Sequence, residues 1–511
     1  MNQDNTSSPA AGCGVTLSEV LSVLGDQANL LRGNAETRVD SVSQDSRTVA
    51  PGCLFTARLG GKVSGLSFAS VALAKGAKAI LTEPDAASVE FLDACAVPVI
   101  SVPNVRARLS EVAELVYGHP SRKLPIVGIT GTNGKTTTAL LVEQALTAVG
   151  SKPGRLGTVG TSFDGTEVES NLTTPEADEL TRFFSHVLAN GGTQVVMEVS
   201  SHSISQGRVS GIRFDVAAFT NLTQDHLDFH GSMEKYEATK LELFTRFQPR
   251  VAVVNVTNEA GHRFAAAARS SRTLRVGLID GCDVRPVDIK LDPLGLRGDV
   301  LVAGRKVALN TRLVGEHNLE NILLSIGILE ALGVDVAEAV RGWQNAAVPG
   351  RLERCDGPED DILVLVDYAH TPDALERALS ATRPLTQGKL HCLFGCGGDR
   401  DPGKRPKMGA AVGRAADRIV LTNDNPRTED PQVIAAAVEV GLKAVAAAYE
   451  IELDRAAAIR RVILSAAPGD VVLIAGKGHE PYQILGTQKY PFDDRVEAKA
   501  SLSMRRSGTH H

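Results

Sequence analysis

The chain has 511 residues, of which 43% are hydrophobic and 22% are charged. At about 100 to 200 residues per domain, this length predicts several domains and excludes a single hydrophobic core. The composition is typical of globular proteins, which argues against disorder and fibrous repeats. The net charge of -6 is too small for a bulk attraction to nucleic acid or anionic lipid, so we expect any anion to be bound at a local site.

Hydropathy and cysteine content indicate the cellular context. No run reaches the roughly 18 apolar residues of a membrane span, and residues 1–14 lack the basic start and apolar core of a signal peptide. We therefore expect a cytoplasmic protein without membrane insertion. The seven cysteines are an odd, scattered set, which favours reduced thiols over disulfides. Only Cys392 and Cys396 are close, and they are more typical of a strand and a loop than of a zinc site.

The first region has the pattern of a small α/β module behind a frayed tail, residues 1–14. Thr16-Leu17-Ser18-Glu19 matches a capping box and predicts the start of a helix. His119-Pro120-Ser121 is typical of a linker, so we expect an N-terminal domain of residues 1–121. Strands are predicted at residues 39–42, 53–57, 79–81 and 97–102, and helices at residues 68–75 and 105–117.

The second region alternates apolar strands and helices, which predicts a doubly wound, mostly parallel sheet. A strand at residues 125–129 runs through a glycine-rich turn into a helix at residues 136–149. Further strands are predicted at residues 194–199, 216–219 and 251–256, and the short β segments within residues 265–312 indicate an inserted or edge sheet. We expect a central domain of residues 122–349.

Pro349-Gly350-Arg351 interrupts the pattern, and a second α/β unit of Rossmann-like kind follows. Its strands are predicted at residues 362–367, 389–394, 418–422 and 470–475, with helices at residues 373–382, 433–448 and 455–465. We expect a C-terminal domain of residues 350–511 that ends in a loose tail at residues 505–511. The predicted fold is therefore α/β with three domains.

A phosphate site is predicted where the strand at residues 125–129 meets its helix. In the run Gly131-Thr132-Asn133-Gly134-Lys135-Thr136-Thr137, backbone N–H groups and the helix N-terminus can cradle phosphate oxygens. Lys135 is placed to contact the β and γ phosphates, and the Thr136 hydroxyl to bind Mg²⁺. Ile129 stands where the strict motif has glycine, so this is a P-loop variant. An ordinary glycine-rich turn is the less favoured alternative.

Two further segments add groups that suit Mg²⁺. Glu198 ends an apolar strand, which is the usual place for a carboxylate that holds the metal directly or through water. His226 lies in Asp225-His226-Leu227-Asp228, and the reading of His226 as a structural histidine is about as well supported as that of a ligand. No Asn-Lys-x-Asp motif is present, which lowers the expectation of a GTPase.

Together these segments resemble the Mur ligase family of ATP-dependent amide-forming enzymes over residues 39–499. Within the family, other segments resemble the members that add the third residue of the peptidoglycan stem peptide. The family-wide segments are residues 128–136, 197–202, 225–228, 315–321, 349–351 and 366–370, and the more specific ones are residues 45–47, 395–400, 424–427 and 476–480.

The resemblance implies an enzyme that joins meso-diaminopimelate to UDP-N-acetylmuramoyl-L-alanyl-D-glutamate with ATP and two Mg²⁺. It implies that the UDP substrate is bound by Ser46, Thr173, Thr174, Ser200, Gln206 and Arg208. It implies that Asn318, Asn321, Arg351 and Asp367 contact the nucleotide in addition to the phosphate loop. It implies that diaminopimelate is held by Arg400, Asp424, Asn425, Pro426, Arg427, Gly476 and Glu480.

The implied chemistry is activation of a carboxylate as an acyl phosphate, which the incoming amine then attacks. Lys135, Glu198, His226 and Lys240 are the implied catalytic residues, because charge on the transferring phosphoryl group must be offset. By resemblance, Lys240 is carbamylated and becomes a metal ligand together with Thr136, Glu198 and His226. The alternative for Lys240 is a solvated lysine paired with Glu237 one turn away.

The choice of amino acid is predicted to depend on Arg427, because a guanidinium can bind the distal carboxylate that diaminopimelate has and lysine lacks. The alternative is that Arg427 caps a loop on the protein surface. Three other functions stay open: the same ligation with L-lysine, a P-loop NTPase that is not a ligase, and a noncatalytic nucleotide-binding module. We expect a monomer that binds small-molecule substrates and no nucleic acid.

Overall fold

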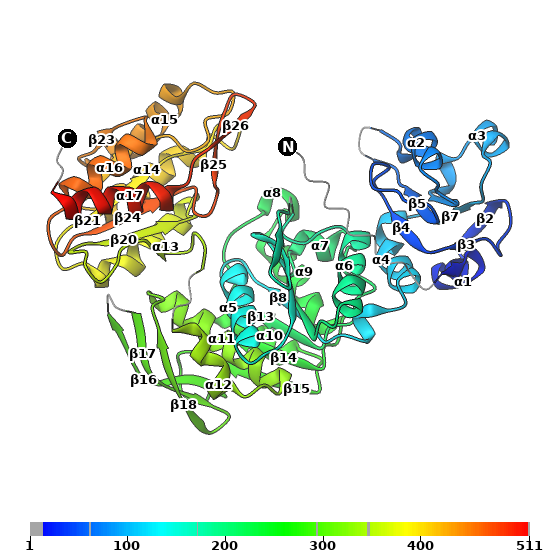
Figure 1. Ribbon diagram of the computed structural model, residues 1–511, viewed down its shortest axis with the longest axis horizontal. Helices are drawn as coiled ribbons and strands as arrows, with labels where there is room; N and C mark the ends of the chain where they lie inside the picture. Colours follow the sequence, from blue (N-terminus) through cyan, green and yellow to red (C-terminus); the bar gives the residue numbers. More distant parts are fainter. Residues whose placement is uncertain (1–13, 61–62, 171, 293–294, 345–347, 509–511) are drawn as a thin grey trace. The chain divides into compact units, whose positions relative to one another are not determined.

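The computed structural model describes residues 14–60, 63–170, 172–292, 295–344 and 348–508. Most of the predicted frayed tail, residues 1–14, therefore lies outside the described residues. Three large β-sheets with flanking helices make up the fold (Figure 1), so the α/β prediction is confirmed. Contacts divide the chain into two compact units, Met1–Pro286 with Leu301–Lys306 and Glu320–Val340, and Val287–Val300 with Val307–Leu319 and Arg341–His511.

The first sheet has five strands in the order β2-β7-β6-β5-β4. Helices α1 and α4 pack on one face and α2 on the other, and the predicted capping box at Thr16 and Glu19 starts α1. The elements are β1 (Val15–Thr16), α1 (Leu17–Leu24), β2 (Asn29–Arg32), β3 (Arg38–Val39), β4 (Ser41–Ser43), β5 (Cys53–Ala57), α2 (Ala69–Ala74), β6 (Ala79–Thr82), α3 (Val89–Ala94), β7 (Val99–Ser101) and α4 (Val105–Val116), with 3-10 turns at Gly65–Phe68, Pro84–Ala86 and Pro120–Arg122.

The second sheet has eleven strands in the order β11-β10-β9-β12-β8-β13-β14-β15-β16-β17-β18. Its centre, from β9 to β15, is parallel, as the alternating pattern predicts. The strands are β8 (Ile126–Thr130), β9 (Pro153–Gly157), β10 (Gly160–Phe163), β11 (Thr166–Val168), β12 (Gln194–Glu198), β13 (Val216–Phe219), β14 (Val251–Asn255), β15 (Arg272–Val276), β16 (Val284–Asp292), β17 (Gly295–Val302) and β18 (Arg305–Thr311). The predicted edge strands within residues 265–312 are thus confirmed.

Helices cover this second sheet because its strands are apolar on both faces. The core on one face joins α6, α9 and α10 to the strands through Phe184, Phe244 and Phe264, all fully buried. The helices are α5 (Lys135–Ala148), α6 (Ala177–Ala189), α7 (Ser201–Ser205), α8 (Leu227–His230), α9 (Met233–Thr245), α10 (Glu259–Ala267), α11 (Glu316–Leu332) and α12 (Val336–Ala339), with a 3-10 turn at Val340–Trp343. Among the described residues, none of the helices has the length and apolarity needed to cross a membrane.

The third sheet has six strands in the order β19-β20-β24-β21-β22-β23, and β20 to β23 are parallel. In β20, Leu363 and Leu365 face α13, α14 and α15, whereas Val364 and Val366 face α16 and α17. The elements are β19 (Glu353–Arg354), β20 (Leu363–Asp367), α13 (Pro372–Thr382), β21 (Leu390–Phe394), α14 (Lys404–Ala415), β22 (Arg418–Leu421), α15 (Pro431–Ala444), β23 (Glu450–Ile451), α16 (Arg455–Ser465), β24 (Val471–Ala475), β25 (Tyr482–Leu485), β26 (Gln488–Pro491) and α17 (Asp494–Ser507), with a 3-10 turn at Arg383–Leu385.

One prediction about the C-terminus was wrong. Residues 505–507, expected in a loose tail, belong to α17, while residues 509–511 lie outside the described part of the chain. The helix forms because Asp494, Ala498, Ser501 and Leu502 recur at helical spacing and are buried, although the sequence around them is strongly polar. The predicted domain boundaries at residues 121 and 349 stay predictions.

Candidate active site

The phosphate loop lies where β8 meets α5, as predicted, and is held against the loop that follows β13. Asn221 accepts from the backbone N–H of Thr132 through its carbonyl, at 2.9 Å, and from that of Asn133 through its side chain, at 3.0 Å. Gly131 has φ 143°, and a Cβ there would lie 1.9 Å from Thr220 Oγ1, so only glycine fits. Gly134 has φ 87° and faces the side chain of Asn321. Thus Asn321 is at the loop where the nucleotide is expected.

Two lysines converge on this loop. Lys135 Nζ lies 2.8 Å from the carbonyl oxygens of Gly131 and Thr132, and Lys240 Nζ lies 2.9 Å from that of Gly131. Thr136 and Thr137 follow at the start of α5 and are both buried. The loop therefore carries two positively chargeable groups on one carbonyl oxygen, which suits a strongly anionic ligand.

Lys240 is not the solvated lysine that the alternative interpretation expected. Its side chain is 1% exposed and lies 4.4 Å from the ring centre of Tyr236, whereas Glu237 pairs with Arg263 at 2.6 Å. Burial lowers the pKa of Lys240 well below its usual value, and the charge of Lys135 lowers it further, with Asp225 opposing. A lysine in this setting is biased toward its neutral amine.

Glu198 lies at the end of β12, beside β8, as predicted. Its carboxylate is 1% exposed and accepts from the backbone N–H of Thr158 at 2.8 Å and from the Thr158 hydroxyl at 3.2 Å. Gly157 is required next to it, because a Cβ there would lie 2.2 Å from Glu198 Oε1. Thr158 is a site residue that the sequence did not reveal.

His226 is half exposed, and its imidazole ring packs edge-on against His202 with ring centres 4.8 Å apart. Burial lowers the pKa of His226, the positive charges of Lys135 and Lys240 lower it further, and Asp225, whose Oδ2 lies 3.4 Å from His226 Nε2, opposes them. A neutral imidazole can ligate a metal ion. His226, Lys135 and Lys240 thus lie close enough to influence one another.

The residues beside the phosphate loop offer part of a ligand set for Mg²⁺. Among the described residues, no three His, Cys, Asp or Glu side chains are grouped closely enough to hold a metal by themselves. Mg²⁺ usually takes one or two protein carboxylates and completes its shell with water and substrate phosphates. The buried carboxylate of Glu198 and the neutral imidazole of His226, both beside a phosphate loop, fit that partial ligand set.

The residues expected to bind the UDP substrate form a second cluster in the same unit. Thr174 Oγ1 lies 3.3 Å from Ser200 Oγ and donates to the Glu198 carbonyl at 2.9 Å, and Thr173 Oγ1 lies 3.1 Å from Thr158 Oγ1. Arg208 donates to the Thr174 carbonyl at 2.8 Å. These contacts join the predicted substrate residues to the strand end that carries Glu198.

Arg106 and Glu176, which the sequence did not single out, complete this cluster. Arg106 on α4 and Arg208 both donate to Gln206 Oε1, at 3.0 and 2.6 Å. Glu176 lies within 3.6 Å of both guanidinium groups. Burial lowers the pKa of both arginines. The two guanidinium groups share Glu176 as their counter-ion, so the cluster keeps one excess positive charge, which suits a diphosphate or carboxylate.

Ser46, the remaining predicted substrate residue, lies in the loop between β4 and β5 and is largely buried. Two residues earlier, Gln44 is bound to Asp178 on α6 through its backbone N–H at 3.2 Å and its side-chain amide at 3.0 Å. The first sheet is therefore tied to α6 close to Ser46. No local spacing in the sequence predicts this long-range contact.

In the second unit, Asn318, Arg351 and Asp367 have clear structural partners. Asn318 donates to the Val314 carbonyl at 2.8 Å. Asp367 accepts from the backbone N–H groups of Leu352 and Ala369, at 2.7 and 2.8 Å, and burial raises its pKa while Arg351 opposes. The Arg351 guanidinium lies 5.1 Å from the Tyr368 ring centre.

The residues expected to bind diaminopimelate gather at the carboxyl ends of β21, β22 and β24. Asn425 donates to Glu480 Oε2 at 2.8 Å, and a Cβ on Gly476 would lie 2.5 Å from Asp424 Oδ2. Pro426 is buried beside them, whereas Arg400 is exposed. Ligands usually bind at this edge of a parallel sheet.

Arg427 is half-buried and has φ 53°, a left-handed conformation that is uncommon outside glycine. Its backbone N–H donates to the Ile484 carbonyl at 3.1 Å, and its Nη1 donates to the Gly398 carbonyl at 2.8 Å. Nε and Nη2 have no hydrogen-bond partner among residues that the structure describes. One side of the guanidinium braces a loop, and the other side is available to a ligand.

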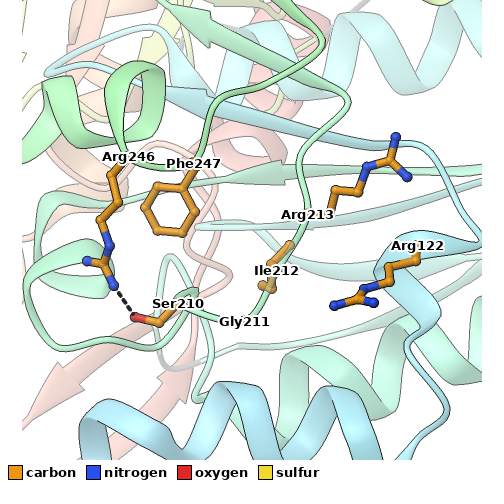
Figure 2. A pocket seen from close by; sticks show the side chains of 7 residues that line it. All are labelled: Arg122, Ser210, Gly211, Ile212, Arg213, Arg246 and Phe247. Atoms are coloured by element: carbon orange, nitrogen blue, oxygen red, sulfur yellow. Dashed lines mark hydrogen bonds between the residues drawn. The ribbon is translucent and has the colours of Figure 1, made fainter. Parts of the chain in front are cut away.

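A separate cavity of about 500 Å³ lies in the first unit (Figure 2). Arg246 donates there to Ser210 Oγ at 3.1 Å, and the other two arginines of the lining point in different directions (Figure 2). None of the predicted site residues lines this cavity, and its three guanidinium groups do not converge. The lining consists of Arg122, Ser210, Gly211, Ile212, Arg213, Arg246 and Phe247.

Comparison with known families agrees with this architecture. Residues 129–329 match the model of the Mur ligase middle domain, residues 350–478 that of the Mur ligase glutamate ligase domain, and residues 38–117 that of the Mur ligase family catalytic domain. The chain therefore belongs to the Mur ligase family.

The similar proteins within this family include ligases that share one name. The chain is 45% identical to UDP-N-acetylmuramoyl-L-alanyl-D-glutamate--2,6-diaminopimelate ligase of Gloeobacter violaceus, over 92% of this chain and 95% of the relative. It is 42% identical to the ligase of the same name from Solibacter usitatus, over 96% and 98% of the two chains. A solved structure of a ligase with this name is 30% identical with a TM-score of 0.70, covering 96% of this chain and 99% of that one.

Proposed function

We propose that this chain is an ATP-dependent ligase that adds meso-diaminopimelate to UDP-N-acetylmuramoyl-L-alanyl-D-glutamate in peptidoglycan synthesis. Family membership supports the class of reaction, and the relatives at 42% and 45% identity are named for this substrate pair. The D-glutamate carboxylate would attack the γ phosphate of ATP and displace ADP. The amine of diaminopimelate would then attack the acyl phosphate and displace phosphate. This order avoids the expulsion of oxide from a carboxylate.

The observation that carries the proposal is the buried Lys240 beside Lys135 at the phosphate loop. Carbamylation joins a neutral amine to CO₂ and releases one proton, so a lysine whose pKa is lowered by burial is suited to it. The product is an anion next to the ammonium of Lys135. It would replace a neutral amine beside that ammonium with an opposite charge.

The ligands of two Mg²⁺ would come from Thr136, Glu198, His226 and carbamylated Lys240. Bound metal would supply positive charge where phosphate and carboxylate oxygens meet. Lys135 would neutralise charge on the transferring phosphoryl group, while the loop N–H groups from Gly131 to Gly134 orient it. Thr158 would hold the Glu198 carboxylate in place through its two hydrogen bonds.

The remaining predicted residues would act in three groups. Arg208 and Gln206, with Arg106, would bind the anionic part of the UDP substrate, together with Ser46, Thr173, Thr174 and Ser200. Asn318, Asn321, Arg351 and Asp367 would contact the nucleotide. The third group would hold diaminopimelate, with Arg427 on its distal carboxylate, and consists of Arg400, Asp424, Asn425, Pro426, Arg427, Gly476 and Glu480.

The proposal also covers the domain organisation, the oligomeric state and the cellular compartment of the protein. Family models match three successive segments, which supports domains at residues 1–121, 122–349 and 350–511. We propose that the chain acts as a monomer. ATP and a UDP-linked substrate support action in the cytoplasm.

The test is an assay of purified protein with the UDP-dipeptide, Mg-ATP and a panel of amino acids. We expect phosphate release and a ligated product with meso-diaminopimelate, and little of either with L-lysine. Hydroxylamine should trap the acyl phosphate as a hydroxamate when the amino acid is omitted. Steady ATP hydrolysis without UDP substrate would instead favour an NTPase, and binding of ATP without turnover would favour a noncatalytic module.

A further inference from the structure

Lys477 is a fully buried lysine in the second unit, next to the residues expected to bind diaminopimelate. Its side chain is 0% exposed, and its ammonium donates to three oxygens: Asn425 Oδ1 at 3.2 Å, Glu480 Oε2 at 3.2 Å and the Tyr482 carbonyl at 2.5 Å. A buried ammonium is costly unless its donors are satisfied, so three acceptors around one nitrogen define its position closely.

These acceptors belong to two chain segments, because Glu480 and Tyr482 both lie in the run that follows Lys477 itself. Asn425 lies in the loop after β22, Glu480 in the loop after β24, and Tyr482 begins β25. The segment of Asn425 also carries Arg427, whose backbone N–H donates to the Ile484 carbonyl in β25. Lys477 is therefore the point at which the loops with predicted diaminopimelate residues are joined.

The bonds around Lys477 also fix the direction of two side chains. Asn425 Oδ1 accepts from Lys477 and from the backbone N–H of Ile484 at 2.8 Å, which turns its Nδ2 toward Glu480. Glu480 Oε2 then accepts hydrogen bonds from both Asn425 and Lys477. Oε1 of Glu480 has no hydrogen-bond partner among the residues described here, so one carboxylate oxygen is left to meet an ammonium of the substrate.

We propose that Lys477 is a positioning residue for the amino-acid substrate, acting through Asn425 and Glu480. This inference rests on the proposed function, because it assumes that these two residues bind diaminopimelate. Lys477 itself is enclosed by protein, so it would act through these neighbours and not by direct contact with the substrate. Its loss should weaken amino-acid binding and leave ATP and UDP-substrate binding intact.

The fold should tolerate the replacement of Lys477, because a second buried cation holds the neighbouring backbone. Arg455 pairs with Asp494, both 0% exposed, and donates to the carbonyls of Asn423 and Ala475 at 3.0 Å. Those carbonyls come shortly before Asn425 and Lys477 in the chain. The strand ends therefore stay anchored when the Lys477 ammonium is removed.

The experiment compares Lys477→Met with the matched control Arg505→Met by steady-state kinetics. Arg505 also donates to backbone carbonyls, those of Ile463 and Ala466, and pairs with Asp361 at 2.8 Å, near the opposite end of β24. For Lys477→Met we expect the KM for meso-diaminopimelate to rise about 30-fold or more, with kcat and the other two KM values within about threefold of wild type. The control should leave all KM values within that range.

Rescue supplies a second readout. In Lys477→Ala, added n-propylammonium should lower the raised KM for diaminopimelate, whereas tetramethylammonium, which has no N–H donor, should not. If Lys477→Met does not fold, Lys477→Gln takes its place in the kinetic comparison. The glutamine amide retains a hydrogen-bond donor without the charge, and the same change in the KM for diaminopimelate is expected.

The outcomes separate this inference from the proposed function. A folded Lys477 variant with an unchanged KM for diaminopimelate overturns the inference. A variant in which kcat falls and all three KM values rise together overturns it as well. If wild-type protein fails to ligate diaminopimelate, the proposed function itself is wrong. If wild type ligates it and only the variant result is negative, the ligase stands and Lys477 is structural.

Discussion

Among the residues that the structure describes, two lysines are buried, and their electrostatic settings are opposite. Lys240, in the first unit, has the Gly131 carbonyl as its hydrogen-bond acceptor and the cation of Lys135 nearby, and burial lowers its pKa strongly. Lys477, in the second unit, lies 3.2 Å from the carboxylate of Glu480 and has two further oxygen acceptors. Both are almost fully enclosed, so exposure does not distinguish them.

The difference shows how partners decide the role of a buried lysine. Where a carboxylate balances the ammonium, the side chain can join loops as a fixed cation. Where the nearest charge is another cation, the neutral amine is favoured, and a neutral amine is a nucleophile. We therefore assign chemistry to Lys240 and positioning to Lys477, and the predictions below test that contrast.

The largest effect is expected from Lys135→Ala. Lys135 shares the Gly131 carbonyl with Lys240, and its loss removes a cation placed for the γ phosphate. We expect ligation to fall by at least two orders of magnitude, about 3 kcal/mol or more of transition-state stabilisation. Product formation is measured by mass spectrometry, and exposed Lys152→Ala serves as the control. Turnover close to wild type in folded Lys135→Ala would contradict the phosphate-loop assignment.

Lys240→Ala should also abolish most ligation, by about two orders of magnitude, because the carbamate ligand is lost. Short carboxylates such as acetate or formate should restore part of the activity if they occupy the place of the carbamate. Carbon-13 NMR after equilibration with labelled bicarbonate should show a carbamate signal in wild type that is absent from the variant.

The control for Lys240 is Lys235→Ala, since Lys235 is an exposed lysine on the same helix, α9. This variant should keep both the carbamate signal and full activity. Full activity of Lys240→Ala, with no dependence on carboxylates, would assign Lys240 a purely structural role and remove the contrast with Lys477.

Arg427→Ala should cost about 100-fold in kcat/KM for meso-diaminopimelate, because a charge-assisted pair with the distal carboxylate is lost. ATP and UDP-substrate KM values should stay unchanged, since the residue is expected to contact only the amino acid. Exposed Arg418→Ala on β22 is the matched control. If wild-type protein adds L-lysine as efficiently as meso-diaminopimelate, Arg427 does not set specificity.

Much of the fold could be predicted from local patterns. The parallel strands β8, β12, β13 and β14 are short apolar runs, and the capping box at Thr16 starts α1 as expected. Strands β9 to β11 were not predicted. In β9 the reason is its content of Pro153, Gly154 and Gly157, residue types that are depleted in strands. Gly157 is needed there for its close approach to Glu198, a contact that no local pattern encodes.

The site was predictable as a set of motifs and not as a network. Lys135 starts α5 after the loop that follows β8, and Glu198 ends β12. No motif marks Thr158, which donates to Glu198, or Arg106, which donates to Gln206. Their contacts join residues 40 and 100 positions apart in the chain. Lys240 illustrates the limit best, because its helix has a mixed sequence and only packing reveals that it is buried.

The smallest expected effect concerns Asp178, an acidic counterpart of Lys240. Asp178 is 2% exposed, and its hydrogen bonds come from the neutral Gln44. Burial raises its pKa to about 6, with a contribution from Glu179 and opposition from Arg182 and Gln44. The folded state thus holds a proton that the unfolded state releases near pH 4. Folding stability should therefore fall as pH rises from 4 to 6 and then level off.

Asp178→Asn removes this dependence while an amide can still pair with Gln44, whose Oε1 is buried without a partner among the described residues. The free energy of unfolding of the variant minus that of wild type should be about 1 kcal/mol larger at pH 8 than at pH 5. Urea unfolding at both pH values measures this difference, with exposed Asp26→Asn as the control. A gain that is equal at the two pH values would mean that Asp178 is ionised throughout, and that neutral hydrogen bonds alone can stabilise a buried charge here.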